Sequence, residues 1–279
     1  MMLLVFASQD LQPHISLVSS ATVGTGREGK IVGLTGNKGA VGVSLRCHQD
    51  DLCIVNSHLA PHKLDIDKRN EDFHHICNRL EFGQEEDSKD SDLRRIEDHR
   101  MRFWLGDLNY RLNDLRTEEV KRLVTYNNLD QLLDHHDQLV QERHHQAVFV
   151  GWSEGRIRFR PTYKYDIGSN NWDSSEKCRT PAWTDRILWR GENVCQTEYR
   201  SHEKLNASDH KPVSASFKLG LRVIDEARRE KVREKLQRKI SEETLFNRHG
   251  FLTSFHRILS RSKTNQKDKD SNSASPQSP

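Results

Sequence analysis

Short runs of apolar residues, each bounded by turn residues, recur along the first 220 positions of the chain. Several of these runs alternate apolar and polar side chains, which is typical of a strand with one buried face. The run Ala40–Cys47, for example, reads AVGVSLRC. The other runs that predict strands are Met1–Phe6, Leu52–His58, Met101–Leu105, Arg156–Arg160, Ile187–Trp189 and Val213–Phe217.

Longer segments with a helical pattern lie between these strands. Helices are expected at Lys68–Phe82, Thr117–Asn127 and Asp134–Arg143. Strands interleaved with helices are typical of a layered α/β fold with a mixed sheet. No repeat of the length used by solenoid or propeller proteins is visible in the sequence.

The C-terminal part of the chain has a different composition. Gly220 marks the expected edge of a folded domain over residues 1–220. Ile224–Leu245 contains neither Gly nor Pro and is rich in Glu, Lys and Arg, so residues 221–245 are expected to form a charged helix. Residues 246–279 are basic and become rich in Ser, Lys, Asp and Asn, which predicts a largely disordered tail.

The overall composition favours a soluble, cytoplasmic protein. Apolar residues make up 34% of the chain and charged residues 30%, with 44 Lys and Arg against 41 Asp and Glu. The basic excess lies in residues 222–263, whereas residues 1–221 are slightly acidic, which argues against nucleic acid as a partner of the folded body. The five cysteines form no CxxC pair and are expected to be reduced thiols.

The strongest candidate for chemistry is the segment WLGDLNYR at positions 104–111. Asp107 and Asn109 lie two residues apart directly after an apolar strand, so their side chains point the same way. Asp107 can orient a water molecule while Asn109 binds a phosphoryl oxygen. An Asx turn that closes the strand explains this short pattern equally well.

Three other polar clusters also stand at strand boundaries. His210 in ASDHKPV can act as a proton donor, Asp185 in RTPAWTDRI can orient that histidine, and Asp209 can lie beside a metal ion. His58 ends the run VNSH. Each cluster alone is more typical of a hydrogen-bonded strand end. Together they combine carboxylates, amides and imidazoles without a cysteine ligand, which favours Mg²⁺-assisted phosphoryl chemistry.

Six segments in order resemble one known family. GNKGAVGVSL, VNSHLAPH, WLGDLNYRL, PTYKYD, RTPAWTDRILW and SDHKPV are similar to motifs of the inositol polyphosphate 5-phosphatases. These motif sequences are most similar to those of the type II branch, which includes the Lowe syndrome phosphatase, and the resemblance covers roughly residues 1–222. It implies the DNase I-like fold of endonucleases, exonucleases and phosphatases, a two-layered mixed β-sheet sandwich flanked by helices.

The resemblance implies a role for each catalytic candidate. Asp107 would activate or orient the attacking water, and Asn109 would hold the scissile 5-phosphate. His210, paired with Asp185, would stabilise the developing charge. His58 would contact the same phosphate.

The resemblance also implies the residues that bind the rest of the headgroup. A phenol and three cations would converge on the 4-phosphate, and a Gly-bounded loop would meet other phosphates. Without the resemblance, the same residues would be interpreted as solvated charged loops. The 4-phosphate residues are Tyr163, Lys164, Lys177 and Arg179, and those of the Gly-bounded loop are Asn37 and Lys38.

The metal site departs from the family pattern. Members of the family use Mg²⁺, and their domain begins with strands that carry an Asn and then a Glu, which is the principal ligand. Nothing in Met1–Gln12 resembles that motif, so the domain is expected to be incomplete at its N-terminus. Asp209 would lie near the metal, and whether another carboxylate such as Asp10 replaces the Glu stays open.

A second departure concerns the membrane. The family touches the bilayer with a short apolar-tipped loop, which here is longer and carries the charged insertion Arg27–Lys30. Ile31, Val32 and Leu34 are the expected lipid contacts. The resemblance implies peripheral association with endosomal, Golgi or plasma membranes.

Two hypotheses of different class follow. The first is a monomeric Mg²⁺-dependent phosphatase that removes the 5-phosphate from phosphatidylinositol 4,5-bisphosphate, phosphatidylinositol 3,4,5-trisphosphate and soluble inositol polyphosphates. The alternative is a fragment that binds phosphoinositide headgroups without turnover. Nuclease activity on abasic DNA would use the same catalytic residues, but neither the charge distribution nor a DNA-reading element supports it.

Overall fold

The computed structural model describes residues 1–25, 38–83 and 93–241. The chain divides into two units, Met1–Val223 and Ile224–Pro279. In the second unit, residues 226–241 are helical and every one of them is exposed. None of the helices in the described ranges has the length and apolar composition that a membrane crossing requires.

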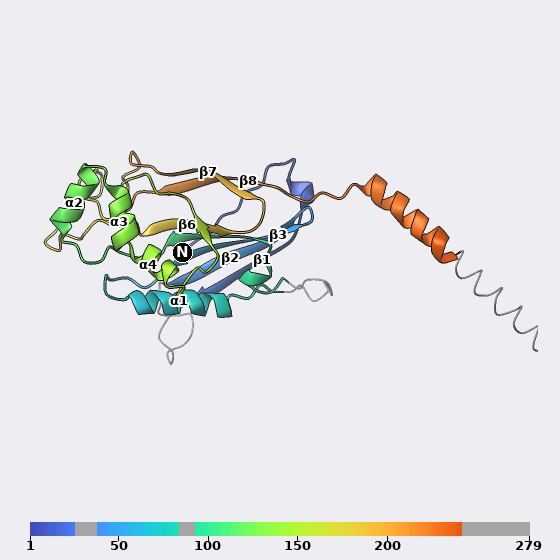
Figure 1. Cartoon of the computed structure of the whole chain (residues 1–279), viewed down its shortest axis with the longest axis horizontal. Helices are drawn as coiled ribbons and strands as arrows, with labels where there is room; N and C mark the ends of the chain where they lie inside the picture. The colour runs from blue at the N-terminus through green and yellow to red at the C-terminus, as the bar shows by residue number, and fades with distance from the viewer. Residues whose placement is uncertain (26–37, 84–92, 242–279) are drawn as a thin grey trace, which may run out of the picture. The chain divides into compact units, whose positions relative to one another are not determined.

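A six-stranded mixed sheet forms the centre of the first unit (Figure 1). Its spatial order is β1-β2-β3-β4-β6-β5, and only the β3–β4 pair among the described ladders is parallel. This arrangement confirms the expected α/β fold with a mixed sheet. The strands are β1 (Ile15–Gly24), β2 (Gly39–Cys47), β3 (Asp50–His58), β4 (Met101–Asp107), β5 (Ser153–Glu154) and β6 (Asp185–Arg190).

A two-stranded sheet of β7 (Val194–Ser201) and β8 (Val213–Leu219) lies on one face of the large sheet (Figure 1). The layers meet through aromatic rings. Phe217 contacts Phe103 and Trp189 edge to face, with ring centroids 5.1 and 5.3 Å apart. This packing places β8 over the middle of the large sheet, above β4 and β6.

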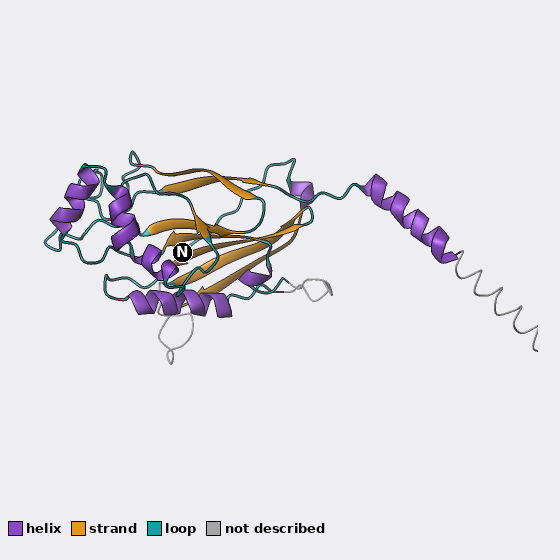
Figure 2. Cartoon of the chain, viewed as in Figure 1, coloured by secondary structure: helices purple, strands orange, loops and turns teal. Residues whose placement is uncertain are grey.

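Helix α1 (Ile66–Arg79) covers the opposite face (Figures 1 and 2). Its apolar side chains recur at helical spacing, and Phe73 and Ile76 pack into the main core with Trp104 of β4. Three further helices flank the sheet, with α2 and α3 around a second core that includes Trp183. These helices are α2 (Thr117–Thr125), α3 (Leu129–His136) and α4 (Gln138–His144).

The predicted strand at Met1–Phe6 is wrong. The segment is irregular, and Phe6 is 87% exposed. A strand needs a neighbour with free ladder groups, but β2 and β3 are already paired on both sides. Asn56 of β3 instead holds this segment by donating from Nδ2 to the carbonyl oxygen of Met2 (2.9 Å).

Two other predicted elements are also wrong. Residues 156–160 are irregular because the neighbouring strand β5 ends at Glu154, so their alternating pattern has no partner to pair with. The single helix expected at 134–143 is broken at Asp137, which has an extended backbone and caps α4 by accepting a hydrogen bond from the Val140 amide (3.0 Å). The strands β1 and β7 were missed because Ser, Thr and charged residues occupy much of both.

A buried ion cluster joins α4, β5 and β6. Arg186 donates from Nη1 to both carboxylate oxygens of Asp137 (2.9 and 3.0 Å) and from Nε to Glu154 (2.6 Å). The side chains of Arg186 and Asp137 are fully buried, and that of Glu154 is 5% exposed. Because every charge in this cluster is paired, its members tolerate burial, but loss of one member leaves the others uncompensated.

We therefore expect the Arg186→Met substitution to lower the free energy of unfolding by about 3–5 kcal/mol. The matched control is Arg156→Met, which breaks the exposed pair with Asp130 and should leave the free energy of unfolding nearly unchanged, because solvent screens such pairs. Urea unfolding followed by tryptophan fluorescence measures both effects. Equal losses for the two variants would contradict the prediction.

Candidate active site

The register of three neighbouring strands brings polar side chains to one edge of the sheet. His58 ends β3 and pairs with Asp107 at the end of β4, which in turn pairs with Asp185 at the start of β6. The three residues therefore form one row across three strands. Because side chains in a strand alternate between faces, paired residues in such a row project on the same side of the sheet.

A glycine permits the close approach of β3 and β4 beside this row. Gly106 has a φ of +133°, which L side chains rarely adopt. A Cβ atom at this position would clash with the carbonyl oxygen of Ser57. The backbone conformation that positions the Asp107 carboxylate at the end of β4 therefore requires glycine at position 106.

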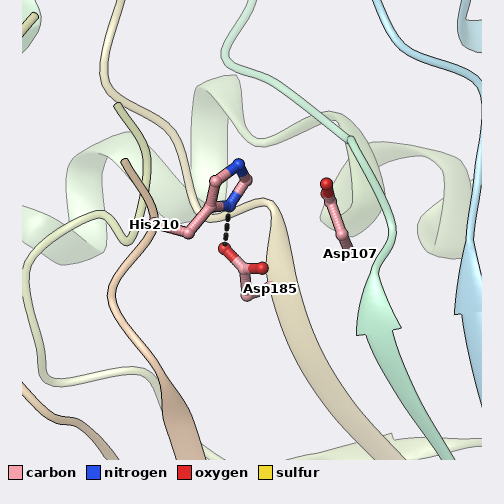
Figure 3. Close-up of side chains that lie close together, drawn as sticks. All are labelled: Asp107, Asp185 and His210. Atoms are coloured by element: carbon pink, nitrogen blue, oxygen red, sulfur yellow. Dashed lines mark hydrogen bonds and ion pairs between the residues drawn. The ribbon is translucent and has the colours of Figure 1, made fainter. Parts of the chain in front are cut away.

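Asp185 and His210 form a hydrogen-bonded pair (Figure 3). His210 Nδ1 lies 2.9 Å from Asp185 Oδ2, which also accepts hydrogen bonds from the hydroxyls of Thr162 (2.7 Å) and Thr184 (2.9 Å). Burial lowers the pKa of His210, but the hydrogen bond and charge of Asp185 outweigh it, so the pKa is raised above its ordinary value. The pair favours a cationic imidazole whose Nε2 is directed away from Asp185.

Asp107 is held in its ionised form. Its Oδ2 lies 3.1 Å from His58 Nε2, and its Oδ1 accepts a hydrogen bond from the backbone amide of Asn109 (3.1 Å). Burial raises the pKa of Asp107, but the hydrogen bond with His58 and the charge of His210 outweigh it and lower the pKa. Lys38 Nζ contacts His58 Nε2, and burial lowers the pKa of this lysine.

Asn109 is fixed inside the protein. Its residue is 3% exposed and has a φ of +57°, a conformation that Asn tolerates better than most residues. The side-chain amide donates to the carbonyl oxygen of Leu59 (3.1 Å), and its Oδ1 accepts a hydrogen bond from Arg111. The structure therefore places Asn109 beside Asp107, with both of its side-chain polar atoms engaged.

Three side chains lie close enough together to hold a metal ion, although the cationic form of His210 offers it no ligand atom. One ligand atom each from Asp107, Asp185 and His210 lies within 4.8 Å of the others. The two carboxylates fit a hard divalent cation such as Mg²⁺, which binds through oxygen and keeps several waters. Asp209, predicted to lie near the metal, is not in this group, and its Oδ2 accepts a hydrogen bond from Lys164 Nζ (2.6 Å).

Only two of the four residues predicted to bind the 4-phosphate line a common pocket. Tyr163 and Arg179 line a pocket of about 240 Å³. Lys164 is paired with Asp209, and Lys177 is exposed on its loop. Four predicted residues fall outside the described ranges, namely Asn37 of the Gly-bounded loop and the lipid contacts Ile31, Val32 and Leu34.

Several residues of the site were not predicted. Thr162, Thr184 and Arg111 fall within the segments PTYKYD, RTPAWTDRILW and WLGDLNYRL, respectively. Their position in the sequence, close to the candidate residues, could have marked them as members of the site. The hydroxyls fix Asp185, and Arg111 fixes Asn109. Their polar contacts depend on tertiary structure that no short motif specifies.

Comparisons with known proteins give a consistent relationship. Residues 1–216 match the profile of endonuclease/exonuclease/phosphatase family 2. The chain is 46% identical over 239 residues to the type II inositol 1,4,5-trisphosphate 5-phosphatase of Mus musculus, covering 86% of this chain and 23% of that protein. It is 37% identical over 240 residues to the polyphosphatidylinositol phosphatase INP53 of Saccharomyces cerevisiae, covering 85% and 20%.

A solved structure is similar in fold and sequence. It is the inositol polyphosphate 5-phosphatase domain of SPsynaptojanin in complex with inositol (1,4)-bisphosphate and a calcium ion. The TM-score is 0.71 at 34% identity, and the match covers 85% of this chain and 64% of that one. The chain spans about a fifth of the length of the two curated relatives.

The pairing of Asp185 with His210 predicts a pH effect. A raised pKa means that the imidazolium persists as the pH rises through about 6.5, the ordinary value for histidine. The stabilisation from this ion pair is fully present below that pH and is lost as the pH rises through the folded-state pKa. In Asp185→Asn the hydrogen bond and charge of Asp185 are lost, whereas burial and the charges of Asp107 and Asp209 remain, so the pKa of His210 should fall.

NMR titration of the His210 ring protons in metal-free buffer measures this change. Asp130→Asn, at an exposed position on α3, is the control and should leave the titration of His210 unaltered. An unchanged pKa of His210 in Asp185→Asn would show that the carboxylate does not stabilise the imidazolium.

Proposed function

Because this chain belongs to the inositol polyphosphate 5-phosphatases of the endonuclease/exonuclease/phosphatase family, we propose that it hydrolyses the 5-phosphate of inositol phosphates. The proposed substrates are phosphatidylinositol 4,5-bisphosphate, phosphatidylinositol 3,4,5-trisphosphate and soluble inositol polyphosphates. The observation that carries the proposal is the row of His58, Asp107 and Asp185 with His210 beside it. The names of the mouse and yeast relatives support both soluble and lipid substrates.

The residues of the row suit hydrolysis by a water molecule. Asp107 is ionised and can accept a hydrogen bond from the attacking water and direct its lone pair at phosphorus. The water oxygen forms a bond to phosphorus as the bond to the inositol O5 breaks; Asp107 takes a proton from the water, and O5 leaves as a hydroxyl group after taking a proton from solvent. His210, whose cationic form Asp185 stabilises, can donate from Nε2 to a phosphoryl oxygen and stabilise the charge that develops there.

The fixed partners of these groups keep the geometry constant during the reaction. The two threonine hydroxyls on Asp185 hold its carboxylate, which in turn orients the imidazole of His210. Lys38 Nζ contacts the His58 ring, which lies against Asp107, so a cationic side chain stands where a phosphate dianion would enter. Preorganised charges of this kind are the main source of catalysis in phosphoryl transfer.

We include Mg²⁺ in the proposal. Asp107 and Asp185 would hold it, and a bound cation would neutralise charge on the phosphoryl oxygens. The calcium ion named for the SPsynaptojanin domain supports a divalent cation in this family. The role of Asp209 near the metal stays a prediction.

The proposed setting is the cytoplasmic surface of a membrane. A monomer would associate peripherally through Ile31, Val32 and Leu34, with Asn37 at a neighbouring phosphate. The polyphosphatidylinositol phosphatase among the relatives supports a lipid surface as the place of action. The endosomal, Golgi or plasma membrane location stays a prediction from the family.

Asp107→Asn should reduce phosphate release from inositol 1,4,5-trisphosphate by at least about 100-fold, because the amide cannot accept the proton of the water. The matched control is Asp114→Asn, on the exposed loop that follows and also at positive φ, which should retain activity. Phosphate release in the presence of Mg²⁺ is the measurement. Equal activity in the two variants would remove Asp107 from the mechanism.

Metal removal should abolish release by the unsubstituted protein, and added Mg²⁺ should restore it. Release that persists in EDTA would contradict the metal requirement. Calorimetric binding of the trisphosphate without any release would instead support the alternative, a headgroup-binding protein without turnover.

A further inference from the structure

Two adjacent residues at the start of α4 contact segments that carry the site. Asp137 pairs with Arg186, the residue that follows Asp185 in β6. Gln138 pairs with the segment after β4. Its backbone amide donates to the carbonyl oxygen of Arg111 (2.9 Å), and its side-chain Oε1 accepts a hydrogen bond from the Arg111 amide (2.8 Å). The backbone of Arg111 is therefore fixed at both of its polar groups by one residue.

The side chain of Gln138 uses all of its hydrogen-bonding capacity. The residue is 1% exposed, and its amide offers two donor hydrogens and two acceptor lone pairs. Nε2 donates to the Lys63 carbonyl oxygen (3.0 Å) and to Asn113 Oδ1 (2.7 Å). Oε1 accepts from Arg69 (2.7 Å) as well as from the Arg111 amide. These four partners permit only one orientation of the amide, because each of them meets the atom of opposite kind.

Arg111 in turn holds Asn109. Its side chain donates from Nη2 to Asn109 Oδ1 and from Nε to the Asn109 carbonyl oxygen (3.1 Å). A guanidinium offers no acceptor, so the oxygen of the Asn109 amide must face Arg111 and the nitrogen must face elsewhere. That nitrogen donates to the Leu59 carbonyl oxygen (3.1 Å), and its second hydrogen meets no acceptor among the described residues. One hydrogen of a buried amide is thus left for a ligand.

The backbone of Asn109 also needs support from its surroundings. Its φ of +57° is sparsely populated outside glycine and persists where neighbouring groups hold it. Asp107 Oδ1 accepts a hydrogen bond from the Asn109 amide on one side, and Arg111 contacts its carbonyl oxygen on the other. Because Gln138 fixes the backbone of Arg111, the support on that side begins at α4.

We propose that Gln138 is a positioning residue that acts through Arg111 to aim the free amide hydrogen of Asn109 at an oxygen of the scissile phosphate. This inference rests on the proposed function and on the expected contact between Asn109 and that phosphate. Gln138 itself is buried behind the loop and contacts no reacting atom. Its effect on the reaction passes through Asn109.

Kinetics with inositol 1,4,5-trisphosphate in two backgrounds test the proposal. Gln138→Met removes the side-chain hydrogen bonds and should lower kcat/KM about tenfold, because a small displacement of a positioning group is costly. In the Asn109→Gly background, where glycine keeps the positive φ, the same substitution should change kcat/KM less than about twofold. An equal loss in both backgrounds would overturn the proposal, since Gln138 would then act independently of Asn109.

A matched control separates positioning from a general loss of stability. Ser44 Oγ lies 2.6 Å from Nε2 of His99, and both residues are buried. Ser44 lies in β2 away from Gly39, the residue of that strand that pairs with His58. Ser44→Ala should lower the midpoint of urea unfolding and leave kcat/KM unchanged. A loss of activity equal to that of Gln138→Met would overturn the proposal.

Gln138→Glu separates the two halves of the side chain. It keeps an oxygen that can accept from the Arg111 amide and from Arg69, and it loses the two donated hydrogen bonds. Hydrogen exchange of the Arg111 amide reports whether that contact survives. Activity should follow the protection of this amide in both Gln138 variants. Activity lost with a protected amide, or kept with an unprotected one, would contradict the proposed route.

The side-chain NMR signal of Asn109 tests the inference without turnover. Asn109→Gly identifies the signal by its absence, Gln138→Met should shift it, and Ser44→Ala should not. If the unsubstituted protein releases no phosphate, the proposed function fails, and this signal still decides whether Gln138 positions Asn109. A signal that stays unshifted in Gln138→Met would overturn the inference.

Discussion

The pairing of β3, β4 and β6 in a single register governs the functional edge of this protein. His58, Asp107 and Asp185 meet only because each is paired with the next across the sheet. A slip of one residue would turn the middle carboxylate to the opposite face, since side chains alternate along a strand. Gly106 makes the register possible by letting β4 approach the backbone of Ser57 without a side chain between them.

Two sets of paired charges stabilise the same edge of the sheet, one near the surface and one in the interior. Near the surface, Asp185 raises the pKa of His210, and His58 helps to lower that of Asp107, so the charged forms of one imidazole and one carboxylate are both stabilised. Directly behind Asp185, Arg186 turns the other way and joins the buried cluster with Asp137. Two adjacent residues of β6 therefore have different roles: Asp185 pairs with His210 in the proposed active site, and Arg186 stabilises the fold through its buried pair with Asp137.

The proximity of His58, Asp107, Asp185 and His210 could be predicted from the sequence because these residues stand at the ends of recognisable strands within specific segments. The structure of Met1–Phe6 and of residues 156–160 could not be predicted from the sequence. An apolar or alternating pattern forms a strand only beside a partner strand, and neither segment pairs with one in the described structure. The pocket was predicted in part for a similar reason. Lys63 and Arg179 line the same pocket although they lie far apart in the chain, and the loop that carries Lys63 is held by Arg69, so no local signal in the sequence marks their proximity.

We propose that the ends of β3, β4 and β6, with His210 beside them, act as one catalytic unit. A double-mutant cycle on kcat/KM for inositol 1,4,5-trisphosphate, with Asp107→Asn, His210→Gln and the two combined, tests this proposal. We expect the double variant to lose about as much activity as the more damaging single variant. Losses that multiply would show that the two side chains act independently, and that the row is an arrangement of strand ends without a common function.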